Sequence, residues 1–220
     1  MNSQQSSTNP ANPNTTGNSQ EDYQHVQTHL EPAGPLGLVI VAGIIALGVQ
    51  QGSNIINLKN FDPKAPEVYA EMAKTLIETG NAAEATVWKV PVAEGLAWED
   101  VEDTMRFVAN EHNIKNVGEL PLSEQVQLMT GEEQRFLKIY MFCNPLTAAS
   151  MFEYSVAFSA YLPCRISLIE DTDGKLWIYT LNMDMMIHGG MPLPEELKAE
   201  AIKVKQIMLD IMNRGAAGDF

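Results

Sequence analysis

The chain has 220 residues, enough for one domain with appendages or for two small domains. Its 14 basic and 28 acidic side chains give a formal charge of -14, which excludes nucleic acid as a partner because phosphate binding needs a basic surface. Two cysteines are too few for a disulfide scaffold, and no C-x-x-C motif is present.

Residues 1–33 form a polar tail that begins MNSQQSSTNPANPNTTGNSQ. Such a segment has too little apolar surface to offset the entropy lost on ordering, so we predict that it is disordered. His25 and His29 stand at a helical spacing, but no third strong metal ligand lies near them.

Residues 34–57 lie in the stretch PAGPLGLVIVAGIIALGVQQGSNIINL, which carries no charge from Pro32 to Leu58. A helix over this segment is long enough to cross about 30 Å of hydrocarbon. A core helix would have a polar stripe, and a cleaved signal peptide would follow a basic N-terminus. We therefore predict one transmembrane helix in contact with lipid, in a single-pass protein of the inner membrane. Lys59 and Lys64 follow the span, and no basic residue precedes it, so the positive-inside rule favours a cytoplasmic domain.

The rest of the chain is predicted to hold a linker helix over 58–82, a globular domain over 83–215 and a short tail over 216–220. Pro66 and Gly80 suit the first turn and the C-cap of the linker helix. Periodicity then predicts a strand at 85–92, a helix at 98–113, a short helical element at 122–131, a strand at 135–142, a helix at 146–154, a hairpin of strands at 164–170 and 175–183, and a helix from about Pro194 to Gly215. This order predicts an α+β fold.

Two motifs flank the short helix at 146–154: C-N-P at 143–145 and L-P-C at 162–164. Their order and spacing, followed by a hairpin, resemble the domain of unknown function 302 family over roughly residues 85–187. The resemblance implies a TATA-binding-protein-like fold, in which helices pack on one face of an antiparallel sheet. Members of this family have no established activity. Longer, membrane-anchored chains that resemble this one occur in sulfur-oxidising bacteria.

Both cysteines flank the predicted strands. If these strands are antiparallel neighbours, as the family fold implies, the two sulfurs lie at the same end of the sheet. Three interpretations stay open: buried thiols, a reactive or ligand-carrying pair, and a disulfide. In a reducing cytoplasm the disulfide would not form. The candidate thiol or ligand site comprises Cys143, Asn144, Pro145, Cys164 and Arg165.

The segment NMDMMIHGGM supplies thioether and imidazole groups, which suit Cu(I) or an axial haem position. Its candidate ligands are Met183, Met185, Met186, His188 and Met191. On a strand, its odd- and even-numbered members would lie on opposite faces, so they could converge only at a bulge. The alternative is that the methionines pack under the last helix.

Two functions remain as hypotheses. The first is a membrane-anchored accessory protein that docks on a protein partner or forms a homo-oligomer, attached to a respiratory or sulfur-oxidation assembly. The alternative is a thiol-redox, sulfur-carrying or soft-metal or haem-binding protein that uses Cys143, Cys164 and the methionine segment. The sequence contains no G-x-S-x-G, phosphate-loop or H-E-x-x-H motif, so we do not expect a classical enzyme.

Overall fold

The computed structural model describes residues 60–220, and the predicted tail and transmembrane helix lie outside this range. Among the helices of residues 60–220, none combines the length and the apolar character that crossing a bilayer requires. The described residues, 60–220, belong to one compact unit.

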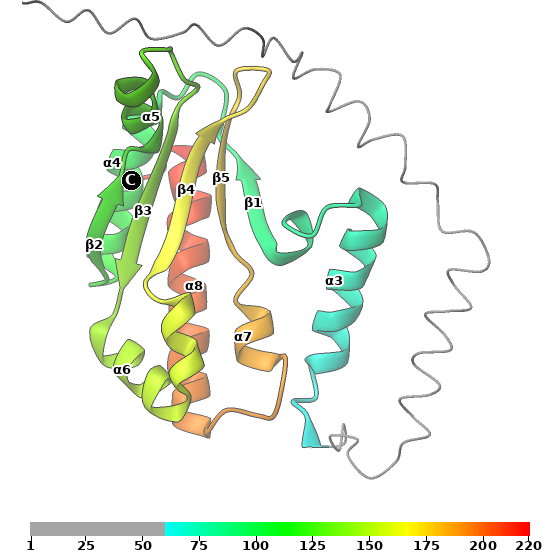
Figure 1. Ribbon diagram of the computed structural model, residues 1–220. Helices are drawn as coiled ribbons and strands as arrows, with labels where there is room; N and C mark the ends of the chain where they lie inside the picture. Colours follow the sequence, from blue (N-terminus) through cyan, green and yellow to red (C-terminus); the bar gives the residue numbers. More distant parts are fainter. Residues whose placement is uncertain (1–59) are drawn as a thin grey trace, which may run out of the picture. The chain divides into compact units, whose positions relative to one another are not determined.

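A five-stranded antiparallel sheet forms the centre of this unit (Figure 1). The strands are β1 (Val87–Pro91), β2 (Lys115–Leu120), β3 (Leu137–Cys143), β4 (Cys164–Glu170) and β5 (Leu176–Leu181), in the spatial order β1-β5-β4-β3-β2. The β4–β5 hairpin turns at Gly174, whose φ of 77° is one that glycine adopts without steric cost. The predicted α+β class is confirmed.

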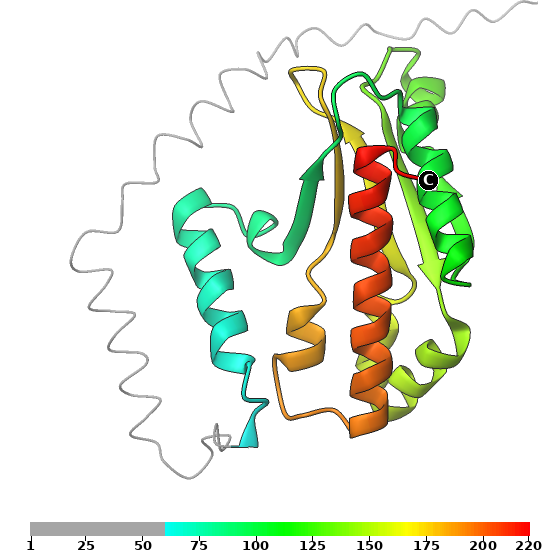
Figure 2. The same ribbon diagram turned by 180° about the vertical axis from the view of Figure 1, so that it is seen from behind.

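Two long helices, α4 (Trp98–Glu111) and α8 (Glu195–Ala217), lie side by side over one face of the sheet (Figure 2). The core lies between these helices and the sheet, and burying each large apolar side chain there contributes about 1.5–3 kcal/mol. Its fully buried members include Val101, Met105, Val108, Tyr140, Phe142, Ile166, Leu168, Ile178, Met208, Ile211 and Met212.

Helix α8 passes the predicted end at Gly215 and terminates at Gly218, whose φ is 67°. The prediction that Gly215 ends the helix is therefore wrong. A Cβ atom at position 215 would lie 2.6 Å from Cγ of Met105. Glycine is needed there because α8 approaches α4 closely, rather than because the backbone turns.

Shorter elements connect the strands. They are η2 (Glu84–Thr86) before β1, α5 (Leu122–Thr130) after β2, α6 (Pro145–Tyr154) and η3 (Val156–Tyr161) between β3 and β4, and α7 (Asp184–His188) after β5. Strand β2 was not predicted, because a register shift between Asn116 and Gly118 interrupts its alternation. The Leu162–Pro163 peptide bond is cis.

Helix α3 (Ala65–Thr79) has the proline in its first turn and the left-handed Gly80 cap that the sequence predicts. Its hydrogen bonds to the segment after α7 attach it to the rest of the unit. The backbone N–H of Asp62 donates to the carbonyl of Gly190 at 2.8 Å, and the Tyr69 hydroxyl donates to the carbonyl of Gly189 at 2.6 Å.

Candidate functional site

The two cysteines lie at the same end of the sheet. Cys143 is the last residue of β3, Cys164 is the first residue of β4, and the antiparallel register places Cys164 opposite Phe142. Both are free thiols. The backbone therefore brings together two sulfurs that are separated by α6 and η3 along the chain.

The two residues that follow Cys143 in the C-N-P motif, Asn144 and Pro145, start helix α6. The side chain of Asn144 accepts hydrogen bonds from the N–H groups of Leu146 and Thr147, at 3.1 and 3.3 Å. Pro145 occupies the first turn, where its missing N–H costs nothing. These two residues turn the chain from β3 into α6 and are not placed as ligands.

A small cavity lies next to the cysteines and is unusually rich in sulfur. We call it the sulfur-lined cavity; its volume is about 30 Å³. Its sulfur-bearing wall consists of Cys143, Met151, Cys164, Met183 and Met186. A second cavity of about 20 Å³ lies beside it and shares Cys164, Met183 and Met186. These volumes accommodate single atoms or small molecules, whereas a haem needs a pocket of several hundred Å³.

Burial keeps both thiols protonated. It raises the pKa of Cys164 to about 11, and the nearby Cys143 adds to this effect. Burial also raises the pKa of Cys143. Arg165 lowers the pKa of Cys164 only slightly, and its own side chain is exposed. Because the thiolate is the nucleophile, this environment does not favour thiol-redox chemistry at neutral pH.

The methionine segment is helical where strand alternation was expected. Strand β5 ends at Leu181, and the Asn182 side chain accepts the N–H of Asp184 at 2.8 Å, which starts α7. The expectation of a strand through this segment is therefore wrong. Only Met183 and Met186 reach the sulfur-lined cavity.

The remaining three candidates of that segment lie elsewhere. Met185 packs against Gly189, and Met191 is 60 % exposed. His188 is buried, with Nδ1 3.3 Å from Asp62 Oδ1 but without a hydrogen bond. Within residues 60–220, no group of three or more His, Cys, Asp or Glu residues is placed to hold a metal ion.

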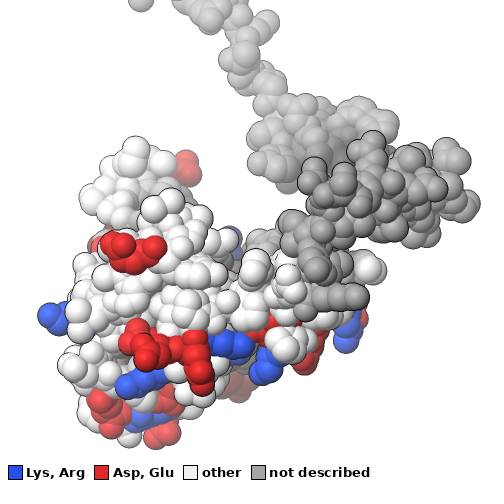
Figure 3. Space-filling model, turned by 90° about the horizontal axis from the view of Figure 1, so that it is seen from below, with Lys and Arg blue, Asp and Glu red and all other residues white. Residues whose placement is uncertain are grey.

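The outer surface of α6 and η3 is exposed and apolar, and we call it the α6–η3 surface. Its exposed large side chains are Leu146, Phe152, Tyr154, Val156 and Tyr161. Residues 144–163 contain one charged side chain, that of Glu153, in a chain with 28 acidic residues. In Figure 3, which views the molecule from below, charged side chains gather in the lower part of the view and a broad area above them is mainly white.

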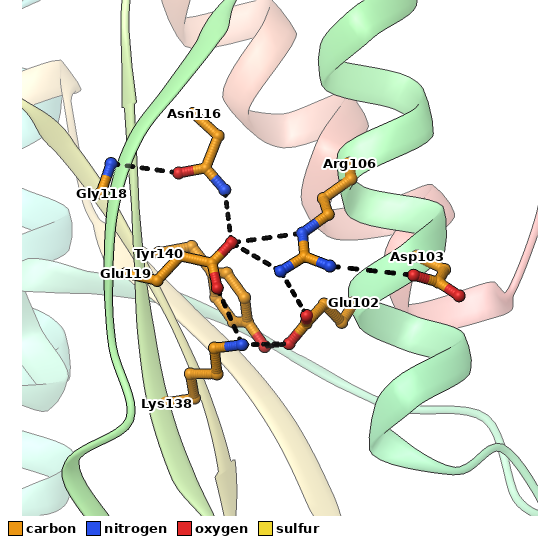
Figure 4. A network of polar contacts seen from close by, with 8 residues as sticks. All are labelled: Glu102, Asp103, Arg106, Asn116, Gly118, Glu119, Lys138 and Tyr140. Carbon is orange, nitrogen blue, oxygen red and sulfur yellow. Dashed lines mark hydrogen bonds and ion pairs between the residues drawn. The ribbon is translucent and has the colours of Figure 1, made fainter.

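A partly buried charged cluster lies between α4 and the edge of the sheet (Figure 4). Glu102 Oε2 accepts hydrogen bonds from Tyr140 Oη at 2.5 Å and from Lys138 Nζ at 2.7 Å. Arg106 Nη2 lies 2.5 Å from Glu102 Oε1 and 2.7 Å from Glu119 Oε1. Lys138 also reaches Glu119 Oε2 at 2.8 Å. Two cations thus balance two carboxylates.

The environment of this cluster stabilises the charged forms. Burial alone would raise the pKa of Glu119, but hydrogen bonds from Lys138, Arg106 and Asn116 outweigh it and hold the pKa at about 2. Burial and then Glu102 raise the pKa of Tyr140. Because each charge has a partner, the cluster is suited to fixing α4 on the sheet rather than to proton transfer. No sequence motif indicated this cluster, although Glu102 lies on the apolar stripe of its helix and Lys138 shares a strand face with Tyr140.

A second buried charged group joins α3 to α7 and α8. Asp62 is 1 % exposed, accepts the N–H of Lys64 at 2.9 Å and is also hydrogen-bonded by Lys198. Burial would raise the pKa of Asp62, but these bonds and the contact with His188 hold it at about 2. On the other side of the imidazole, Nε2 lies 4.0 Å from Asp184 Oδ1.

A comparison with protein-family models assigns the chain to a family. The family model described as "Domain of unknown function DUF302" matches residues 88–215. The chain belongs to this family. The match includes most of α8, and so extends beyond the residues 85–187 over which the motifs suggested a resemblance.

A solved DUF302 structure is similar to this chain. It is titled "Crystal structure of uncharacterized conserved protein DUF302 from Bacillus stearothermophilus", is 17 % identical, and aligns with a TM-score of 0.49 over 59 % of this chain and 97 % of its own. No curated protein matches the chain.

Proposed function

We propose that this DUF302 protein is an accessory interaction module, which residues 34–57 tether to a membrane and which docks on a protein partner through the α6–η3 surface. The exposure of that surface carries the proposal. Leu146 and Val156 are each 81 % exposed, which leaves two aliphatic side chains in water. Large apolar side chains exposed together on one short segment are a feature of interaction sites.

The composition of the surface favours a protein over lipid headgroups as the occupant. Protein interfaces are enriched in aromatic residues and depleted of charge at their centre. The α6–η3 surface shares both features, and its exposed aromatic side chains are Phe152, Tyr154 and Tyr161. Helices that lie on a bilayer usually add lysines and arginines at the polar edge. Residues 144–163 contain neither, and Glu153 would be repelled by anionic lipid.

The end of the domain at which the described chain begins is consistent with a tethered module. In Figures 1 and 2 the described chain begins at the same end of the domain as α6. We take a respiratory or sulfur-oxidation assembly as the setting, because membrane-anchored chains that resemble this one occur in sulfur-oxidising bacteria.

A matched pair of variants tests the proposal. The full-length chain is extracted from native membranes in mild detergent, and the mass of its complex is measured for the wild type, Val156→Asp and Ile77→Asp. Ile77 is a suitable control because it is 82 % exposed on α3, outside the surface. We expect the complex to persist in Ile77→Asp and to be lost in Val156→Asp. A solitary chain in the wild type, or a complex that survives Val156→Asp, would contradict the proposal.

A further inference from the structure

We propose that Cys164, Met183 and Met186 bind one Cu(I) ion at the sulfur-lined cavity. This site is distinct from the proposed docking surface, and its three ligands are the sulfur-bearing residues that line both of the adjoining cavities. They come from the start of β4 and from α7 with its preceding residue, so the ends of two elements line the same two cavities.

The chemistry of the wall selects a soft monovalent cation. Thiolate and thioether sulfurs bind Cu(I), whereas Zn²⁺ requires four ligands drawn from cysteine, histidine and carboxylates. Neither cavity has a histidine or a carboxylate in its wall. His188, the nearest candidate along the chain, is held against Asp62 instead.

The charge of the complex decides which cysteine takes part. One thiolate and two thioethers make an uncharged complex with Cu(I), which costs little in an apolar cavity. Two thiolates would leave a buried net charge of −1 in the sulfur-lined cavity, whose wall contains no charged side chain. Cys164 shares both cavities with the two methionines, and Cys143 lines only one. We therefore assign the thiolate to Cys164 and leave Cys143 protonated.

Binding exchanges a proton for the metal ion. The S–H bond of Cys164 breaks, a Cu–S bond forms, the proton passes to solvent, and no electron is transferred. Because one proton is released for each ion bound, the apparent affinity rises about tenfold for each pH unit over the range in which the free thiol stays protonated. A site with two thiolate ligands would show about a hundredfold rise per unit instead.

The site is tested by anaerobic titration of the full-length chain in detergent with Cu(I), using bicinchoninate as the competing chelator. We expect one equivalent to bind, with an affinity that falls at least 100-fold in Cys164→Ser and about tenfold in Met186→Leu. Cys143→Ser and Met191→Leu should each change it less than threefold. Met191 is a matched control because it is a methionine of the same segment, exposed outside both cavities.

X-ray absorption of the wild type loaded with Cu(I) provides a test that needs no variant. We expect three sulfur neighbours and no nitrogen or oxygen neighbour. The assignment is overturned by the absence of stoichiometric binding, by nitrogen or oxygen ligation, or by equal losses in Cys143→Ser and Cys164→Ser. Circular dichroism of each serine variant separates loss of a ligand from loss of the fold.

Discussion

Two buried residues of this domain, Glu102 and Cys164, lie in opposite electrostatic environments. Glu102 lies among three donors, Arg106, Lys138 and Tyr140. Cys164 lies in an apolar cavity that offers it no strong donor, and burial raises its pKa to about 11. The first environment favours a charged group and the second a neutral one, and each can be tested by one substitution or one reagent.

Replacing Glu102 by alanine should destabilise the domain strongly. The change leaves Lys138 and Arg106 with one carboxylate between them and Tyr140 Oη without an acceptor, which should cost about 3–5 kcal/mol in the free energy of unfolding. Asp103→Ala is the control, because the Asp103 side chain is 71 % exposed and 3.9 Å from Arg106. It should cost less than about 1 kcal/mol by urea unfolding. Equal losses would show that the buried cluster does not stabilise the fold.

Cys164 should react slowly with iodoacetamide in the folded chain. Its pKa of about 11, raised from 9.0 by burial, reduces the thiolate fraction at pH 7 by about 100-fold relative to the unfolded chain. Mass spectrometry of the alkylated peptides gives the rate for each cysteine with and without urea. Rapid labelling of Cys164 at pH 7 in the folded chain would contradict its burial.

At the scale of elements, the attachment of α3 should depend on pH in the acid range. The pKa of Asp62 is about 2 when folded and 3.8 without the fold, so its contribution is complete above about pH 4 and is lost as the pH falls towards 2. We expect Asp62→Asn to cost about 1–2 kcal/mol at pH 6, allowing for solvent screening, and the difference from wild type to shrink near pH 2. Urea unfolding at a series of pH values measures this. A difference that stays constant with pH would show that the charge of Asp62 does not stabilise the fold.

The packing of α8 on α4 should depend on the absence of a side chain at position 215. Gly215→Ala should destabilise by about 1–3 kcal/mol through overpacking against Met105, although alanine is the better helix former. The same change made in a Met105→Ala background should cost less or even stabilise. A cost that is the same in both backgrounds would exclude the steric cause. Thermal unfolding of the two single variants and the double variant completes the cycle.

The elements that the sequence predicted are those with a local signal. Helices α4 and α8 show a 3.6-residue stripe, and the β4–β5 hairpin has alternation on both sides of Gly174. Strand β2 has a bulge that breaks its alternation, and α7 has five residues, too few for a period to show. Local pattern therefore predicted the fold class but not the full sheet.

The sites were predicted less well, because they depend on contacts between distant residues. The motifs placed both cysteines at one end of the sheet once the family fold was assumed. Met183 and Met186 join Cys164 only because α7 replaces the expected strand and lets residues three apart share a helix face. The charged cluster joins Glu102 to Lys138, which lie 36 positions apart, and no pattern within one element indicates such a pair.

At the scale of the whole molecule, the chain is strongly acidic, with a charge of -14, yet its α6–η3 surface is nearly free of charge. Net charge of this size keeps a protein soluble and discourages unspecific association. In such a chain, an uncharged surface with exposed aromatic side chains is consistent with the proposed docking of a protein partner at the α6–η3 surface. The same segment also contributes to the sulfur-lined cavity, because Asn144, Thr147, Ala148 and Met151 line it.

Photo-crosslinking in native membranes tests the docking surface most directly. A photoreactive amino acid is placed at position 156 of the full-length chain, on the α6–η3 surface, and at position 77 as the exposed control on α3. We expect the probe at position 156 to form a discrete adduct with one protein partner and the probe at position 77 to form none. Adducts with lipid alone at position 156, or the same adducts from both positions, would contradict it.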